Sequence, residues 1–243
     1  MKLPSVKKAL ILPLLMTTIC ASSQVMPKNY DAAVKAVEPE LIEWRRHFHE
    51  NPELSNREFN TGAFIAEKMK ALGLEVRYPV AKTGVVAILK GGKPGPVLAL
   101  RADIDALPIT ERTPVSFASK VKTEFNGQKV GVMHACGHDA HTAILMATAR
   151  AFTAMQKDVP GTIVFLFQPA EEGAPNNEEG GAPLMIKEGA LDNPKVEATF
   201  GLHMAAGLPV GTLAYKSGAA QASSDLFTIT VHGKGSHGAL PWG

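Results

Sequence analysis

Residues 161–173 read GTIVFLFQPAEEG, an apolar run that gives way at once to polar and acidic residues. The part from Gly161 to Phe167 predicts a buried, central β-strand, because strands covered on both faces are almost continuously apolar. In open α/β sheets, ligand sites lie where strands end and loops begin. We therefore expect the segment from Gln168 to Gly173 to lie at a functional edge of the sheet.

The segments around this strand alternate between helical and extended patterns. Apolar residues recur at helical spacing from Tyr30 to Glu50, with Asp31 near the start as a cap. Further helices are predicted over residues 58–72, 140–155 and 183–189, and strands over 75–80, 84–89, 97–100 and 196–202. This order predicts an α/β fold, a mixed, largely parallel sheet sandwiched by helices.

Composition places the chain among ordinary globular proteins. Its 243 residues include 25 Lys+Arg and 23 Asp+Glu, and 45% are hydrophobic, which excludes disordered, collagen-like and coiled-coil classes. The formal net charge of +2 and the lack of a basic stripe argue against nucleic acid as a partner.

The first 23 residues have the layout of a secretory signal peptide. Lysines open the segment, an apolar run follows from Ala9 to Cys20, and small residues come next. The run is shorter than the roughly 18 residues that a membrane span needs. We expect residues 1–23 to be removed and the mature protein to be secreted or periplasmic, without a membrane partner. A buried N-terminal helix and lipid attachment at Cys20 are the alternatives.

Three histidines surround the one cysteine of the predicted mature chain, in His134-Ala-Cys136-Gly-His138-Asp139-Ala-His141. Residues two apart in an extended or turn segment project to the same side, so Cys136 and His138 can converge. Thiolate and imidazole are good ligands for zinc and similar cations, and Asp139 could orient a ligand histidine. The cluster predicts a metal site. A structural cluster that caps the following helix is the alternative.

Polar side chains also follow three predicted strands. Glu171 and Glu172 are adjacent and point in different directions, so one can bind a metal while the other accepts a proton from water. A solvated acidic loop would show the same pair. Asp103 and Asp105 share a face after another strand and could support a cation directly or through a histidine, and His203 again ends an apolar strand.

Other histidines give weaker indications. His237 lies in a glycine-rich loop, where the residues alone indicate an exposed loop histidine. His47 and His49 lie near the end of the first predicted helix and are interpreted as a solvated helix end.

Five motifs together resemble the dinuclear metal amidohydrolases that cleave N-acyl amino acids. This family includes hippurate hydrolase and the plant auxin-conjugate hydrolases, and it is related to aminoacylase and the glutamate carboxypeptidases. The motifs are WRRHFHENPE (44–53), LRADIDALP (100–108), MHACGHDAH (133–141), FQPAEEG (167–173) and GLH (201–203). They occur in this order and span nearly all of the predicted mature chain.

The resemblance implies a metal centre and a substrate. Cys136 would bridge two divalent ions, and the further ligands would be His138, Glu172 and His203. The ions would be zinc or manganese, with cobalt or nickel as further possibilities. The substrate would be an N-acyl amino acid or a dipeptide, hydrolysed at its amide bond by activated water.

The resemblance also implies catalytic roles. Glu171 would be the general base and Asp105 a supporting acid beside the metal ligands. His237 matches the lid-domain histidine, which reaches the site of a partner subunit and steadies the oxyanion. The full-length protein would therefore be a homodimer.

The chain departs from the family pattern after the last motif. A typical member has one more metal-ligand histidine in a C-terminal segment, whereas here a half-exposed strand pattern begins near Ser224 and the chain stops at Gly243. We expect residues 24–223 to be the N-terminal part of a catalytic domain. Residues 224–243 would begin an incomplete, small α+β lid or dimerisation domain in a C-terminally truncated chain.

Three other functions compete with the amidohydrolase hypothesis. Cys136 could act as a thiol nucleophile with a histidine as its base. The chain could be a non-catalytic, metal-binding fragment or relic, or the metal could have a purely structural role.

Overall fold

The computed structural model describes residues 30–220 and, after them, 227, 229–230, 232–235, 237–240 and 242. The chain divides into two compact units, the first ending at Met204 and the second beginning at Ala205. The predicted signal peptide and Ser224 lie outside the described residues. The predicted domain boundaries stay predictions.

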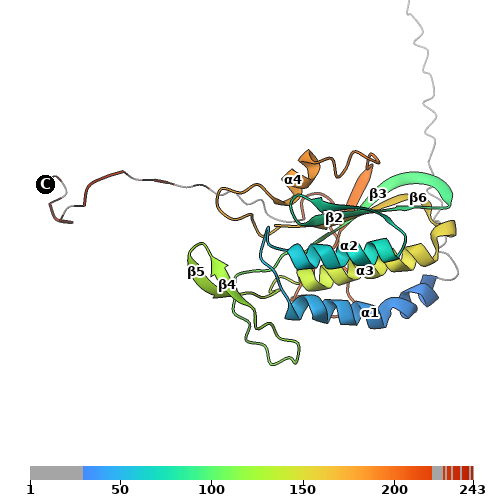
Figure 1. The fold of residues 1–243 in the computed structure, drawn as a ribbon, viewed down its shortest axis with the longest axis horizontal. Coiled ribbons are helices and arrows are strands. Elements are labelled where there is room, and N and C mark those ends of the chain that lie inside the picture. Colours follow the sequence, from blue (N-terminus) through green and yellow to red (C-terminus); the bar gives the residue numbers. More distant parts are fainter. Residues whose placement is uncertain are drawn as a thin grey trace, which may run out of the picture. The chain divides into compact units, whose positions relative to one another are not determined.

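A five-stranded mixed sheet forms the centre of the first unit (Figure 1). Its strands, in spatial order, are β1 (Glu75–Val80), β2 (Gly84–Lys90), β6 (Pro160–Gln168), β3 (Lys93–Asp103) and β7 (Ala198–Gly201). β2 pairs antiparallel with both β1 and β6, whereas the pairs β6–β3 and β3–β7 are parallel. The predicted mixed, largely parallel sheet is confirmed, and the apolar run that starts at Gly161 lies in its middle strand.

Helices cover both faces of this sheet (Figure 1). One face carries α2 (Phe59–Ala71) and α3 (His138–Ala154), and α1 (Tyr30–Glu50) packs on α3. The other face carries the short α4 (Gly181–Lys187). The predicted helices are confirmed, with shifts of a few residues at their ends.

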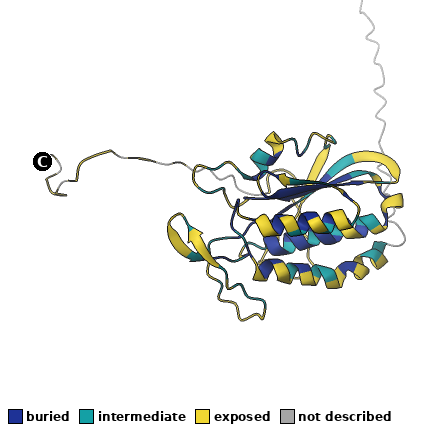
Figure 2. Cartoon of the chain, in the orientation of Figure 1, coloured by how far each residue is buried: buried dark blue, intermediate teal, exposed yellow. Residues whose placement is uncertain are grey.

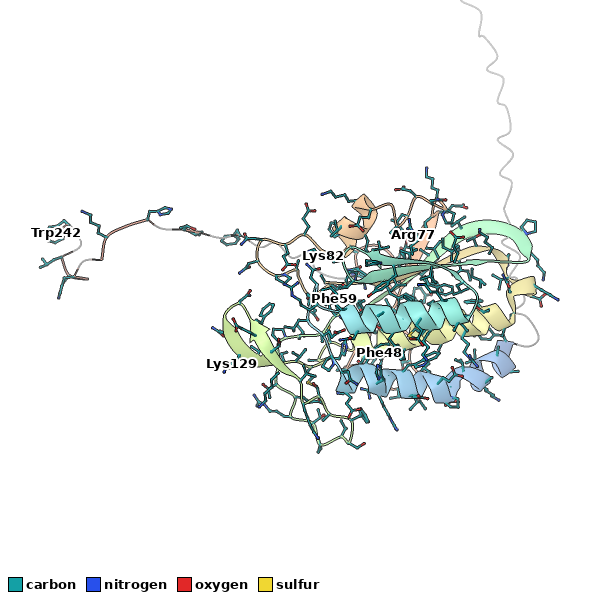
Figure 3. The ribbon with its side chains drawn as sticks, in the orientation of Figure 1. Phe48, Phe59, Arg77, Lys82, Lys129 and Trp242 are labelled. Atoms are coloured by element: carbon teal, nitrogen blue, oxygen red, sulfur yellow. The ribbon has the colours of Figure 1, made fainter. Side chains whose placement is uncertain are left out.

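The apolar core lies on both sides of the sheet, as the dark blue strands in Figure 2 show. Along β2, Val85 and Ala87 belong to the cluster that includes Phe48 of α1, labelled in Figure 3. The intervening Val86 belongs to the cluster on the opposite face, with Met185 of α4. Because both faces are covered, the strand sequences are continuously apolar and do not alternate with polar residues.

A β-hairpin stands apart from these layers in Figure 1 and was not predicted. Its strands are β4 (Lys122–Phe125) and β5 (Gln128–Gly131), and Lys129 is labelled in Figure 3. The turn residues Asn126 and Gly127 both have positive φ angles, as a tight hairpin turn requires. Asn-Gly is a strong local indicator of such a turn, so the sequence did contain the information. Within the described parts of the chain, no helix is both long enough and apolar enough to span a bilayer.

Candidate metal and catalytic site

The site lies at the carboxyl ends of the three parallel strands. Asp103 ends β3, Gln168 ends β6 and Gly201 ends β7, while α3 begins at His138. The motifs that follow these elements are therefore brought to one edge of the sheet, as the strand-end argument predicted.

His138 occupies the middle of this edge and is 1% exposed. Its Nδ1 donates a hydrogen bond to the backbone oxygen of Asp105 at 2.9 Å. Its Nε2 is buried and has no hydrogen-bond partner among the described residues. Carboxylate oxygens of Glu171 and Glu172 each lie 3.7 Å from this Nε2. A buried nitrogen without a partner, faced by acidic oxygens, fits a bound cation.

Cys136 and His203 complete this group. The Sγ atom of Cys136 lies 3.5 Å from Nε2 of His203, whose Nδ1 bonds to the backbone oxygen of Met204. Ligand atoms of Cys136, His138 and His203 all lie within 4.8 Å of one another, as do those of His138, Glu171 and Glu172. The structure thus brings together the four predicted metal ligands and the predicted base.

His141 also lies close, but both of its ring nitrogens are used. Its Nδ1 donates to Oδ1 of Asp103 at 2.6 Å, and its Nε2 accepts the N–H of Met204 at 2.8 Å. Arg101 pairs with the other oxygen of Asp103 at 2.8 Å. His141 therefore holds the segment that carries His203 and has no nitrogen left for a cation.

Asp105 supports the same edge of the sheet. It is buried, and its Oδ2 accepts hydrogen bonds from Oγ of Ser55 at 2.7 Å and from the N–H of Glu172 at 3.0 Å. Burial raises the pKa of the Asp105 carboxyl, but hydrogen bonds from His138, Ser55 and Glu172 outweigh that effect and lower the pKa. The carboxylate is therefore ionised and joins two of the candidate ligands.

The thiol of Cys136 is not activated by its protein surroundings. Burial, followed by the nearby Glu172 carboxylate, raises the pKa of this thiol to about 11. A thiol of this pKa is protonated at neutral pH and is a poor nucleophile, which disfavours the thiol-nucleophile hypothesis. A bound dication would reverse the shift, because a coordinated thiol loses its proton.

Comparison with known proteins also indicates a family of metal-dependent hydrolases. A family model described as peptidase family M20/M25/M40 matches residues 99–241. The chain belongs to this family. The family-level resemblance inferred from the five motifs is thereby confirmed.

Relatives of this M20-family chain include hydrolases of acylated amino acids. It is 45% identical over 208 residues to an N-acetyl-L-cysteine deacetylase of Bacillus subtilis, covering 86% of this chain and 46% of the relative. It is 42% identical to the IAA-amino acid hydrolase ILR1-like 2 of Arabidopsis thaliana, covering 90% and 47%. The chain therefore spans about half the length of the curated relatives it matches.

A solved structure supports the fold and the metal chemistry of the family. The YxeP protein of Bacillus subtilis, described as a dinuclear metal binding peptidase from the M20 family, matches with a TM-score of 0.64 and 45% identity. The match covers 73% of this chain and 45% of that chain.

The prediction that His49 belongs to a solvated helix end is wrong. It is 5% exposed, and its ring lies between two acids, with Nδ1 2.8 Å from Asp139 and Nε2 2.9 Å from Glu111. Arg45 also pairs with Asp139 at 2.8 Å. Asp139, which could have oriented a ligand histidine, instead ties the start of α3 to α1. His47, by contrast, is exposed.

His237 belongs to the second unit and is described there alone. It forms an isolated bridge with Leu240, and its Nδ1 accepts the N–H of Ala239 at 3.2 Å. Its role toward the oxyanion stays a prediction.

Proposed function

We propose that this chain is part of a metal-dependent amidohydrolase that cleaves N-acyl amino acids or small peptides. The observation that carries this proposal is the buried Nε2 of His138, which has no hydrogen-bond partner among the described residues and faces Glu171 and Glu172. Relatives named for deacetylation and for hydrolysis of an amino acid conjugate support the substrate class.

The residues present fit a pair of divalent cations. Cys136, His138, Glu172 and His203 would hold them, with sulfur, nitrogen and oxygen donors that suit zinc or manganese and also cobalt or nickel. When bound, such cations supply Lewis acidity toward the amide carbonyl and lower the pKa of a water molecule beside it.

Glu171 is the proposed general base. Its carboxylate is exposed, takes part in no hydrogen bond among the described residues and has one oxygen 3.7 Å from Nε2 of His138. Glu171 can therefore accept a proton from the attacking water and return it to the leaving amine. This proton transfer needs no covalent intermediate on the protein.

Three further proposals concern the whole protein. His237 would steady the oxyanion in the site of a partner subunit, and the complete protein would act as a homodimer. The N-terminal segment, with its basic start and apolar run, supports export to the periplasm or beyond.

The test is hydrolysis of N-acetyl and N-benzoyl amino acids by the purified protein, followed as amine release. Glu171→Gln should lower kcat by about 10²- to 10⁴-fold while bound metal, measured by elemental analysis, is unchanged. The control is Glu179→Gln, because Glu179 is exposed after the same strand and, among the described residues, its carboxylate pairs only with Lys187. Turnover by Glu171→Gln at the rate of the control would contradict the assignment of the base.

A further inference from the structure

Glu58 is a buried acid that the proposed mechanism does not use. It immediately precedes α2, is 0% exposed and forms no ion pair among the described residues. Burial raises the pKa of its carboxyl to about 7, against the opposing effect of its hydrogen bonds. Burying a carboxyl group in this way is unfavourable unless hydrogen bonds replace its lost hydration, so its partners indicate what it does.

The two oxygens of Glu58 have different partners. Oε2 accepts the hydroxyl of Thr83 at 2.6 Å, which fixes the orientation of the carboxyl group. Oε1 accepts the backbone N–H of Ala170 at 2.8 Å. Ala170 is the residue directly before Glu171, so this second bond reaches the turn that carries the proposed base.

Ala170 needs such support because of its backbone conformation. Its φ angle of 48° lies in the left-handed region, which is unfavourable for a residue with a Cβ atom because that atom comes too close to the following carbonyl oxygen. Its surroundings are closely packed: a Cβ atom on Gly180 would lie 3.1 Å from the Cβ of Ala170, and one on Gly181 would lie 2.9 Å from its oxygen. The strained turn is therefore held by contacts from outside it.

The N–H groups on both sides of Glu171 are held by buried acids. Glu58 binds the N–H of Ala170, and Asp105 binds the N–H of Glu172. The backbone on either side is thereby fixed, while the Glu171 side chain between them remains exposed near His138.

We propose that Glu58 is the positioning residue for Glu171, acting through the N–H of Ala170. This proposal rests on the proposed role of Glu171 as the base. The chemical requirement is a hydrogen-bond acceptor at the position of Oε1. A negative charge at Glu58 is not required.

Two variants distinguish the effect of losing the hydrogen-bond acceptor from the effect of changing the side-chain volume. Glu58→Gln keeps an acceptor for Ala170 and can donate to Thr83, whereas Glu58→Met fills the space without an acceptor. The matched control is Glu53→Met, because within the described part of the chain the Glu53 carboxylate binds only Asn60 and Thr61 at the start of α2. The control thus loses a carboxylate next to the same helix without touching the turn before Glu171.

The expected result is a selective loss of turnover. Glu58→Met should lower kcat by about 10- to 100-fold, with KM and metal content unchanged, because a small misplacement of a reacting group has effects of this size. Glu58→Gln should retain kcat within a few fold, and Glu53→Met should lose thermal stability without losing kcat. Wild-type kcat in Glu58→Met, or equal losses in the Met and Gln variants, would overturn the proposal.

Amide hydrogen exchange of the wild-type protein tests the same contact without activity. The N–H of Ala170 should exchange as slowly as that of Phe165 inside β6, although Ala170 lies beyond the strand. Exchange as fast as at the exposed Gly173 would overturn the proposal. Because this measurement uses the wild-type protein, it remains a test even if Glu58→Met does not fold. A wild-type protein that hydrolyses no N-acyl amino acid but protects Ala170 would instead contradict the proposed function and leave the contact itself supported.

Discussion

His138 and His141 lie about one helical turn apart at the start of α3. The Nδ1 of His138 donates to the backbone oxygen of Asp105, and that of His141 donates to Oδ1 of Asp103, at the end of β3. They differ at Nε2. In His141 this nitrogen accepts the N–H of Met204, whereas in His138 it has no hydrogen-bond partner among the described residues and faces two glutamates. The comparison shows that two histidines with similar supports can have different functions, one as a candidate ligand and one as a structural link.

The largest effect on activity is expected from replacing His138, the candidate metal ligand of the two histidines. His138→Gln removes the imidazole that is common to the two candidate ligand groups described above. Because losing a residue that merely orients a ligand already costs about 10- to 100-fold, we expect losing His138 to lower activity by at least about 100-fold. Elemental analysis should show a matching loss of bound metal.

Replacing His141, the structural histidine, is expected to have a smaller effect, and on stability instead of metal binding. His141→Gln leaves Asp103 without its 2.6 Å hydrogen bond and leaves the N–H of Met204 without its imidazole acceptor. We expect the free energy of unfolding to fall by about 1–3 kcal/mol, with bound metal retained. Urea denaturation measures the first quantity and elemental analysis the second. A loss of metal equal to that of His138→Gln would show that both histidines are ligands.

The smallest expected effect is a change in acid sensitivity. Burial raises the pKa of Asp103, but the hydrogen bond from His141 and nearby positive charges outweigh it, so the folded-state pKa lies below the unfolded value. The stability from this depressed pKa is present above about pH 4 and is lost as the pH falls through the folded-state pKa. In metal-stripped protein, His141→Gln should therefore lose less stability than the wild type as the pH falls below about 4, as urea denaturation at each pH would measure. Equal acid profiles would show that the bond to His141 contributes nothing to this shift.

The fold was largely predictable because its main elements have local patterns. The apolar run after Gly161 indicated the central strand, and helical spacing indicated the long helix that begins at Tyr30. The hairpin around Asn126 was missed although its turn dipeptide is informative, because its strands are short and exposed and show little apolar pattern.

The site was predictable in its members but not in its connections. The rule that ligands bind at strand ends was enough to place Glu171 and His203 at one edge of the sheet. The pairing of His49 with Asp139 joins residues 90 positions apart, and local periodicity contains no information about such contacts. For the same reason, the sequence alone did not distinguish His138 from His141 or reveal the bond from Glu58 to Ala170.

The most direct test of the account is cobalt(II) titration of the metal-stripped protein, followed by the near-ultraviolet absorption of a thiolate–cobalt bond. The account predicts that this absorption develops in the wild type and in His141→Gln. It predicts that the absorption is absent in Cys136→Ser and strongly weakened in His138→Gln. An absorption that persists in Cys136→Ser, or that His141→Gln and His138→Gln weaken equally, would contradict the proposed metal centre.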